Sequence, residues 1–247
     1  MSDTSPKVSA ESGRPFSVGA TLSRTMELFT GGFVRFMVLA TIPLLPLLLV
    51  ELAKSSGSLN EVESGGWSRI LAFLLSPLAN ATILYGAIKE MRGEAFTIGQ
   101  SFVVGISRML AIFGVTICVS IFAAIAAIAL VFPAFIVMCM LFVAIPACVI
   151  EKLGVFASMG RSSDLTRGYR WPIFGLTLII WIISIVLISL AGFMLGLTGG
   201  RQITWLLNFG WQVVSTAFSG VLVAVIYHNL RVAKEGVDVS KIANVFD

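Results

Sequence analysis

Charge is scarce in this chain. Only 12% of its 247 residues are Asp, Glu, Lys or Arg, whereas soluble domains carry about a quarter. Two long segments, residues 109–150 and 171–200, hold no charged side chain at all. With 57% of the residues hydrophobic, the composition excludes an ordinary soluble domain and indicates that the apolar surface faces a lipid bilayer.

Histidine and paired cysteines, which often carry catalysis or bind metals, are nearly missing. His228 is the only histidine, and it lies where the last apolar run ends. Cys118, Cys139 and Cys148 fall inside apolar runs without a CxxC pair, as small buried hydrophobic side chains do. Because a hydrolase needs a base, a nucleophile or a metal, the sequence predicts that the protein is not an enzyme and holds neither a metal nor a cofactor.

The net charge of +4 would suggest nucleic-acid binding in a soluble protein, but membrane topology explains it better. If both termini lie in the cytoplasm, only Lys54, Arg69 and Arg201 of the 17 basic residues fall on the opposite side. Loops on the cytoplasmic side of membrane proteins carry such an excess of Lys and Arg. The sequence therefore predicts cytoplasmic termini and no nucleic-acid partner.

The apolar runs divide into six predicted spans. As one helix, residues 109–150 would extend roughly 60 Å, about twice the hydrocarbon thickness, so they are counted as two spans, the second bent at Pro146. We expect a disordered cytoplasmic tail over residues 1–15, a membrane domain over 16–232 and a cytoplasmic tail over 233–247. The predicted spans are 32–54, 67–86, 107–131, 134–151, 171–196 and 203–230.

An internal repeat suggests how the spans are grouped. FSVGATL at 16–22 matches FTIGQSF at 96–102, and MGRS at 159–162 is a weaker third copy. In the first copy, Val18, Leu22, Met26, Phe29 and Phe33 form one apolar stripe of a helix. We call each such amphipathic helix, lying at the membrane interface before a span, an elbow. The predicted fold is all-α, with six transmembrane helices in three hairpins, each preceded by an elbow.

The most polar elbow is the predicted contact surface. Arg161, Asp164, Arg167 and Arg170 follow at three-residue intervals, which keeps them near one side of a helix. We expect these arginines, with Arg24 of the first elbow, to contact anionic lipid headgroups or a protein partner, and Asp164 to pair with Arg161 or Arg167. The alternative is that the cluster only sets the topology.

Other small and polar residues lie within the predicted spans. Ser76 and Asn80 share one face of the second span and either line a cavity or bond to a neighbouring helix. The centres of spans three to six lack Asp, Glu, Lys and Arg, which disfavours an ion-driven pump. Two rows of residues at four-residue intervals predict that spans five and six pack together: Gly192, Gly196 and Gly200, and Thr216, Gly220 and Ala224.

Three stretches resemble the membrane-domain family that is attached to some glycerophosphodiester phosphodiesterases and also occurs as stand-alone bacterial proteins. They are LSRTMELF at 22–29, EKLGVFASMGRSSDLTRGYRW at 151–171 and YHNLRVAKEGVD at 227–238. The resemblance implies a multi-helix domain of the bacterial inner membrane. It implies no catalysis, because the phosphodiesterase activity of the fused members belongs to a separate soluble barrel.

Together these features predict a non-enzymatic scaffold or accessory protein that engages lipid or a partner through its basic elbows. The alternative is a transporter or permease for a small or lipidic substrate, built around Asn80. A polar cavity shared by Ser76, Asn80, Thr41 and Thr116 would favour transport. Packing of these side chains against helices would favour the scaffold.

Overall fold

The computed structural model describes residues 17–58, 60–129, 131–198 and 204–235, and within them every regular element is a helix. The predicted N-terminal tail and nearly all of the predicted C-terminal tail lie outside these residues. The last helix continues to Glu235, three residues past the predicted boundary at 232. The helices are α1 (Val18–Gly31), α2 (Phe33–Ser55), α3 (Glu61–Met91), α4 (Ile98–Ser107), α5 (Met109–Ala129), α6 (Val131–Met140), α7 (Ala144–Ile150), α8 (Val155–Thr166), α9 (Arg170–Thr198) and α10 (Thr204–Glu235).

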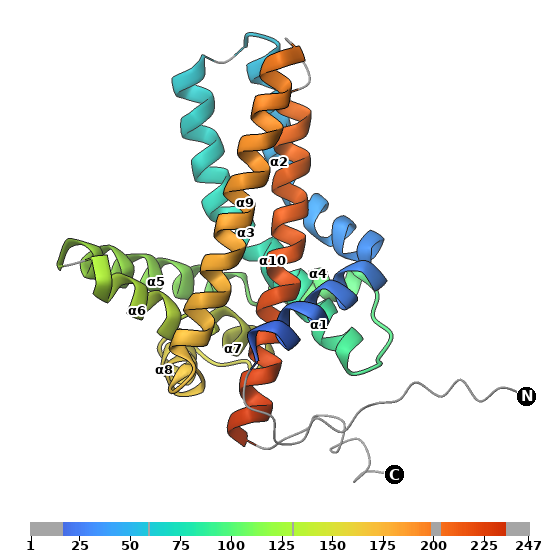
Figure 1. Ribbon diagram of the computed structural model, residues 1–247. Helices are drawn as coiled ribbons and strands as arrows, with labels where there is room; N and C mark the ends of the chain where they lie inside the picture. Colours follow the sequence, from blue (N-terminus) through green and yellow to red (C-terminus); the bar gives the residue numbers. More distant parts are fainter. Residues whose placement is uncertain (1–16, 59, 130, 199–203, 236–247) are drawn as a thin grey trace, which may run out of the picture.

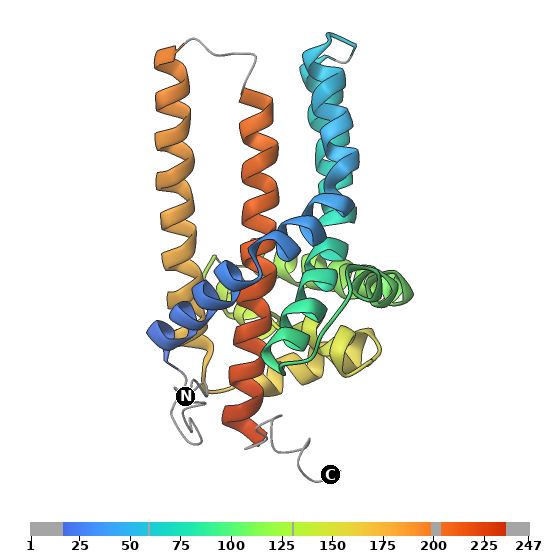
Figure 2. The same cartoon turned by 90° about the vertical axis from the view of Figure 1, so that its right-hand side faces the viewer.

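Four long helices share one direction, and the remaining helices gather toward one end of them. Figures 1 and 2 show α2, α3, α9 and α10 running along a common axis, while α1, α4, α7 and α8 lie toward one end, which we call the elbow end. The opposite end, where α2 connects to α3, is the loop end. The α5–α6 hairpin runs across the common axis in both views.

The protein core forms where α3 packs against α2 and α10. From Ala79 to Ala87, α3 presents small residues between larger ones, so that the neighbouring helices approach closely. Ala79, Ala81 and Ala87 are fully buried, as are Phe36 and Leu39 on the facing helix α2. Close packing of small residues is a main source of helix association in membranes, where lipid removes the hydrophobic driving force between helices.

Five helices are long and apolar enough to cross a membrane, so the chain is a multi-pass membrane protein. They are Phe33–Lys54, Gly65–Met91, Met109–Ala127, Arg170–Phe193 and Leu206–Glu235 in the described part of the chain. The predicted helical class is confirmed, and five of the six predicted spans have a counterpart here. The arrangement of six spans in three hairpins is not confirmed.

The predicted span over residues 134–151, bent at Pro146, is not confirmed, because this stretch falls below the length of the candidate spans. The chain forms two short helices there, α6 and α7, separated at residues 141–143. Ser162 of α8 fills the break: its Oγ donates to the carbonyl of Met140 at 2.8 Å and accepts from the N–H of Val143 at 3.2 Å. Irregular backbone at membrane depth is tolerated where protein satisfies its polar groups, and the hydroxyl group of Ser162 does so here.

The predicted elbows are helices α1, α4 and α8, which precede the apolar helices α2, α5 and α9. Ser17 caps α1 and Thr97, eighty residues later, caps α4 through a capping box. Each elbow buries small hydroxyl side chains, and α1 and α8 also bury larger apolar ones, namely Phe29, Met159 and Leu165. Of the predicted apolar stripe, Met26 and Phe33 are exposed and Phe29 is buried. The fully buried hydroxyl residues of the elbows are Thr21, Thr25, Ser101, Ser158, Ser162 and Thr166.

Helix α9 is exposed on nearly all sides beyond its first two turns. From Thr177 to Phe193, only Ile180 and Ser184 are partly buried. Figure 2 shows α9 standing apart from α10 over its length toward the loop end. A helix that is apolar all round and exposed all round is stable in hydrocarbon but not in water.

Replacing Gly220 by alanine tests the close contact between α3 and α10. A Cβ at position 220 would lie 2.7 Å from Cγ2 and 2.9 Å from Cβ of Ile83. Overpacking of this kind costs about 1–3 kcal/mol, which outweighs a gain of about 1 kcal/mol in helix propensity. We expect Gly220→Ala to lower the midpoint of thermal unfolding in detergent.

The matched control is Gly192→Ala on α9, where nothing lies within 4 Å of the added Cβ. This variant gains helix propensity without overlap, so its midpoint should stay unchanged or rise. Equal midpoints for the two variants would contradict the packing described here.

Candidate functional site

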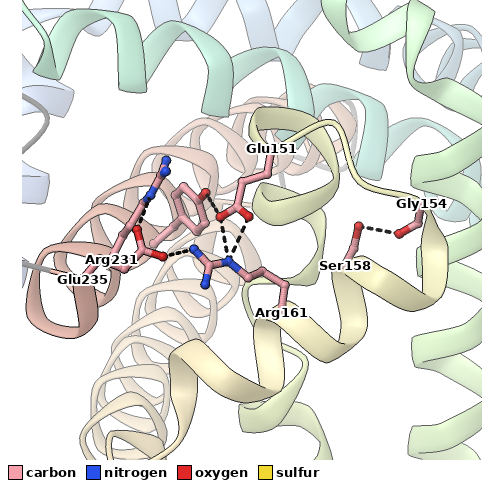
Figure 3. A network of polar contacts seen from close by, with 7 residues as sticks. Glu151, Gly154, Ser158, Arg161, Arg231 and Glu235 are labelled. Atoms are coloured by element: carbon pink, nitrogen blue, oxygen red, sulfur yellow. Dashed lines mark hydrogen bonds and ion pairs between the residues drawn. The ribbon is translucent and has the colours of Figure 1, made fainter. Parts of the chain in front are cut away.

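The most connected group of polar side chains lies at the elbow end of α10. Arg161 of α8 donates from Nε to both carboxylate oxygens of Glu151, at 3.0 and 2.8 Å, and from Nη2 to Glu235 of α10. Tyr227 donates to Glu151 at 2.7 Å, and Arg231 donates to Glu235 at 2.9 Å. Figure 3 shows Glu151, Arg161, Arg231 and Glu235 pointing toward one another. We call the five residues the α10 network.

Local structure explains how the residues of the network meet. Tyr227, Arg231 and Glu235 follow at four-residue intervals and therefore share one face of α10. Glu151 is the C-cap of α7, and the chain turns back at Lys152, whose φ of 56° lies in the left-handed region. The carbonyl of Lys152 accepts from Arg108 at 3.3 Å, which holds the turn. Helix α8 then carries Arg161 back toward Glu151 and α10.

The network balances its own charges. Two carboxylates face two guanidinium groups, and the side chains of Glu151, Arg161, Arg231 and Glu235 are between 16% and 27% exposed. Burial alone would lower the pKa of Arg161, but hydrogen bonds to Glu235 and Glu151 raise it above its usual value. Arg161 is thus charged at every physiological pH. Its Nε and Nη2 donate to the carboxylates of Glu151 and Glu235, so these N–H groups are not available to a lipid phosphate.

A second polar contact fixes the first elbow to the same end of α10. Asn229 donates from Nδ2 to Oγ1 of Thr21 at 3.1 Å, and Thr21 itself donates to the carbonyl of Ser17 at 2.8 Å. Phe29 of α1 also meets Phe218 of α10 edge to face, with ring centroids 5.5 Å apart. Helices α1 and α8 therefore pack against α10 on separate sides (Figures 1 and 2).

The structure separates the predicted basic cluster into different environments. Arg161 belongs to the α10 network, while Asp164 and Arg167 are exposed on α8 and at its C-cap. The ion pairs of Arg161 join it to Glu151 and Glu235 and not to Asp164. Arg170 begins α9 half-buried, and its Nε is buried without a hydrogen-bond partner. Arg24 is partly exposed on α1.

The predicted intramembrane polar residues bond within their own helices. Asn80 donates from Nδ2 to the carbonyl of Ser76 at 2.9 Å, and its Oδ1 is buried without a partner, facing Gly220 of α10. Thr41 donates to the carbonyl of Met37 at 2.7 Å, and Thr116 to that of Ile112 at 2.9 Å. Three of the four predicted residues, Asn80, Thr41 and Thr116, thus have a side-chain hydrogen bond to their own helix.

The described members of the two predicted rows of small residues have different surroundings. On α10, Thr216, Gly220 and Ala224 are buried, and Gly220 lies against Ile83 of α3. On α9, Gly192 is exposed with open space beside it. Gly196 is in α9, but its surroundings lie outside the described residues, as does Gly200.

Sequence reasoning missed most of the α10 network. No site was predicted at the partners of Arg161, which are Glu151, Tyr227, Arg231 and Glu235. Tyr227 and Arg231 have the sequence of an ordinary end of a span, and they are remote from Arg161 in the chain. One signal was available: these residues fall in the stretches 151–171 and 227–238, which carry the family resemblance. Those two stretches meet in the network, and the first stretch, 22–29, lies on α1 beside α10.

Chemically, the site binds helices together. Its titratable groups are engaged with one another, and no group of three or more His, Cys, Asp or Glu in the described residues is arranged to hold a metal. Comparisons with family models, with curated proteins and with solved structures find no match to the chain.

Removing the bridging arginine tests the network. Arg161→Ala leaves Glu151 and Glu235 without their shared partner, and charge-assisted hydrogen bonds contribute about 1.5–3 kcal/mol each when partly buried. We expect the free energy of unfolding in detergent to fall by about 2–3 kcal/mol. Arg167→Ala, on the exposed side near the end of the same helix, should change it by less than about 0.5 kcal/mol.

A double-mutant cycle with Glu235→Ala separates the pair from other effects of each change. A coupling energy of about 1 kcal/mol or more is expected, since the two side chains are in direct contact. Additive effects of the two substitutions would contradict the network.

Proposed function

We propose that the protein is a non-enzymatic scaffold or accessory protein of the bacterial inner membrane, with its elbow end and both termini in the cytoplasm. It engages anionic lipid headgroups through basic side chains that ring the elbow end. The observation that carries this proposal is the position of the exposed cations. Arg92, Lys152, Arg167 and Lys234 are all exposed at the elbow end.

The asymmetry of charge supports the cytoplasmic orientation of the elbow end. At the loop end, the described basic residues are Lys54 and Arg69. The elbow end carries these four cations and Arg35, which is also exposed and pairs with Glu90. It further carries Lys89, paired with Glu94, and Arg161 and Arg231 in the α10 network. The side with more Lys and Arg faces the cytoplasm.

Apolar side chains on the elbows would place these cations at headgroup depth. Phe156 on α8 is 76% exposed, and Met26 on α1 and Trp171 at the start of α9 are exposed as well. Exposed aromatic side chains at the end of a span favour the interface between hydrocarbon and headgroups. Cations beside them can reach phosphate groups while the rings insert below.

The role of the predicted cluster changes in this proposal. Arg161 serves to dock α8 on α10, so the lipid contacts are assigned to Arg167 and to the other exposed cations. Membership of the glycerophosphodiester phosphodiesterase membrane-domain family remains part of the proposal. It is supported by the contact between the stretches that carry the resemblance, since residues that interlock in the fold are those a family would share.

A transporter is the second candidate, and it depends on Asn80. Its Oδ1 is a buried polar atom without a partner in the middle of the bundle, which is where substrate sites of transporters lie. Against this, Thr41 and Thr116 bond to their own helices, and Asn80 lies beside the close contact of Gly220 with Ile83. These contacts favour the scaffold.

Neutralising the four exposed cations tests the lipid contacts. Arg92→Gln, Lys152→Gln, Arg167→Gln and Lys234→Gln together remove attraction of about 1 kcal/mol per cation near an anionic surface. The retention of phosphatidylglycerol relative to phosphatidylcholine, measured by native mass spectrometry from mixed nanodiscs, should fall roughly tenfold or more.

The matched control is Lys54→Gln with Arg69→Gln, which removes exposed charge from the loop end. It should leave the lipid ratio unchanged. If the four-fold variant retains the anionic lipid as well as the parent does, the elbow end does not bind headgroups. Loss of a co-purifying protein in that variant would instead assign the surface to a protein partner.

A further inference from the structure

The α5–α6 hairpin, described over residues 109–129 and 131–140, is apolar yet is not aligned with the long helices. No charged residue occurs between Arg108 and Glu151. Leu110, Ile117, Ile121 and Ile125 are all at least 47% exposed on α5. Since exposed side chains of this kind are stable only in hydrocarbon, the hairpin must lie inside the bilayer, although its direction crosses the common axis of α2, α3, α9 and α10 (Figures 1 and 2).

Contacts with α9 give the depth of the hairpin. Phe135 of α6 meets Phe174 of α9 edge to face, with ring centroids 5.3 Å apart. Phe174 is three residues from Trp171, the exposed aromatic residue at the elbow end of α9, and their rings are 6.1 Å apart. If Trp171 marks the interface, the hairpin lies about one helical turn, roughly 5 Å, below it.

The returning helix of the hairpin, α6, is too short to cross the bilayer. Helix α6 has 10 residues and extends about 15 Å, half of the hydrocarbon thickness. Its continuation α7 is fixed inside the protein, because Ala144, Ala147 and Cys148 are fully buried. The break at residues 141–143, held by Ser162 and by Thr166, which also donates to the Met140 carbonyl at 3.3 Å, prevents α6 and α7 from forming one long helix.

We propose that the α5–α6 hairpin is a wedge that binds the acyl chains of one leaflet, the leaflet at the elbow end, and does not cross the membrane. The length and composition of α5 alone would permit a crossing, but the short α6 and the fixed α7 do not permit the return. The chain then crosses four times, through α2, α3, α9 and α10. This inference is independent of the headgroup contacts proposed above, because it concerns uncharged residues in the hydrocarbon.

A wedge has a physical consequence for the membrane around it. The hairpin occupies area in one leaflet and none in the other, so lipid packing is matched best where the leaflet at the elbow end is convex. The protein should therefore concentrate in membrane that curves toward the elbow end, as amphipathic helices inserted in one leaflet do.

Spin-label depth measurements on the full chain in liposomes test the wedge. Single cysteines are introduced at the exposed positions Ile117, Ile121, Ile125 and Met138, in a background with Cys118, Cys139 and Cys148 replaced by alanine. The ratio of collision rates with oxygen and with a water-soluble nickel complex reports the depth of each label. The wedge predicts the same shallow depth at all four sites.

Helix α9 supplies the depth scale within the same protein. Labels at the exposed positions Leu178, Ile182, Val186 and Leu190 should pass through a maximum of depth, since this helix crosses. A similar maximum along α5 would overturn the wedge and restore a crossing hairpin. If the α9 series showed no maximum, the cysteine-free background would have lost the fold, and the series would be repeated with Cys148, which is buried, left in place.

The curvature preference has its own readout. Fluorescently labelled protein, reconstituted in giant vesicles and oriented with its elbow end outward, should be denser in a tube pulled from the vesicle than in the flat membrane. Equal densities would contradict the curvature preference.

Discussion

The double ion pair of Arg161 is the interaction on which the elbow end depends. This one side chain joins Glu151, which closes α7, to Glu235 in the last turn of α10. It thereby holds α8 against α10, and α8 in turn supplies the hydroxyl groups that fill the break between α6 and α7. The direction of the α5–α6 hairpin follows from that break. A single bridging guanidinium therefore links the end of the last span to the position of a hairpin that begins more than 100 residues earlier in the sequence.

Bilayer chemistry explains why hydroxyl groups take this structural role. Backbone N–H and C=O groups in hydrocarbon need partners inside the protein, and Ser and Thr supply them without adding charge. The elbows bury such residues at four-residue intervals, Thr21 and Thr25 on α1 and Ser158, Ser162 and Thr166 on α8. Their larger apolar side chains divide between two faces, since Phe29, Met159 and Leu165 are buried whereas Met26 and Phe156 are exposed. The elbows thus bury small hydroxyl groups beside some of their apolar residues and leave other apolar residues for the membrane.

The sequence was sufficient for the features that arise from local pattern and insufficient for those that arise from contacts between distant segments. Uncharged runs such as residues 171–200 predicted long apolar helices, and the repeat at 16–22 and 96–102 predicted the elbows, because helix periodicity and capping are local properties. The break before Pro146 could not be predicted, since it depends on Ser162 from another helix. The partners of Arg161 were missed for the same reason, as Glu235 lies 74 residues away. The burial of Thr21 and Thr25 on α1 was missed because the apolar stripe marks only apolar side chains as candidates for burial.

Hydrogen–deuterium exchange of the Glu235→Ala variant in nanodiscs tests most directly whether the α10 network holds the elbow end together. If it does, backbone exchange will rise in α7 and α8, at residues 144–166, although the substitution is on α10, and exchange in α2 will be unchanged. Faster exchange confined to the last turn of α10, with α7 and α8 as protected as in the parent protein, would show that the network does not dock α8.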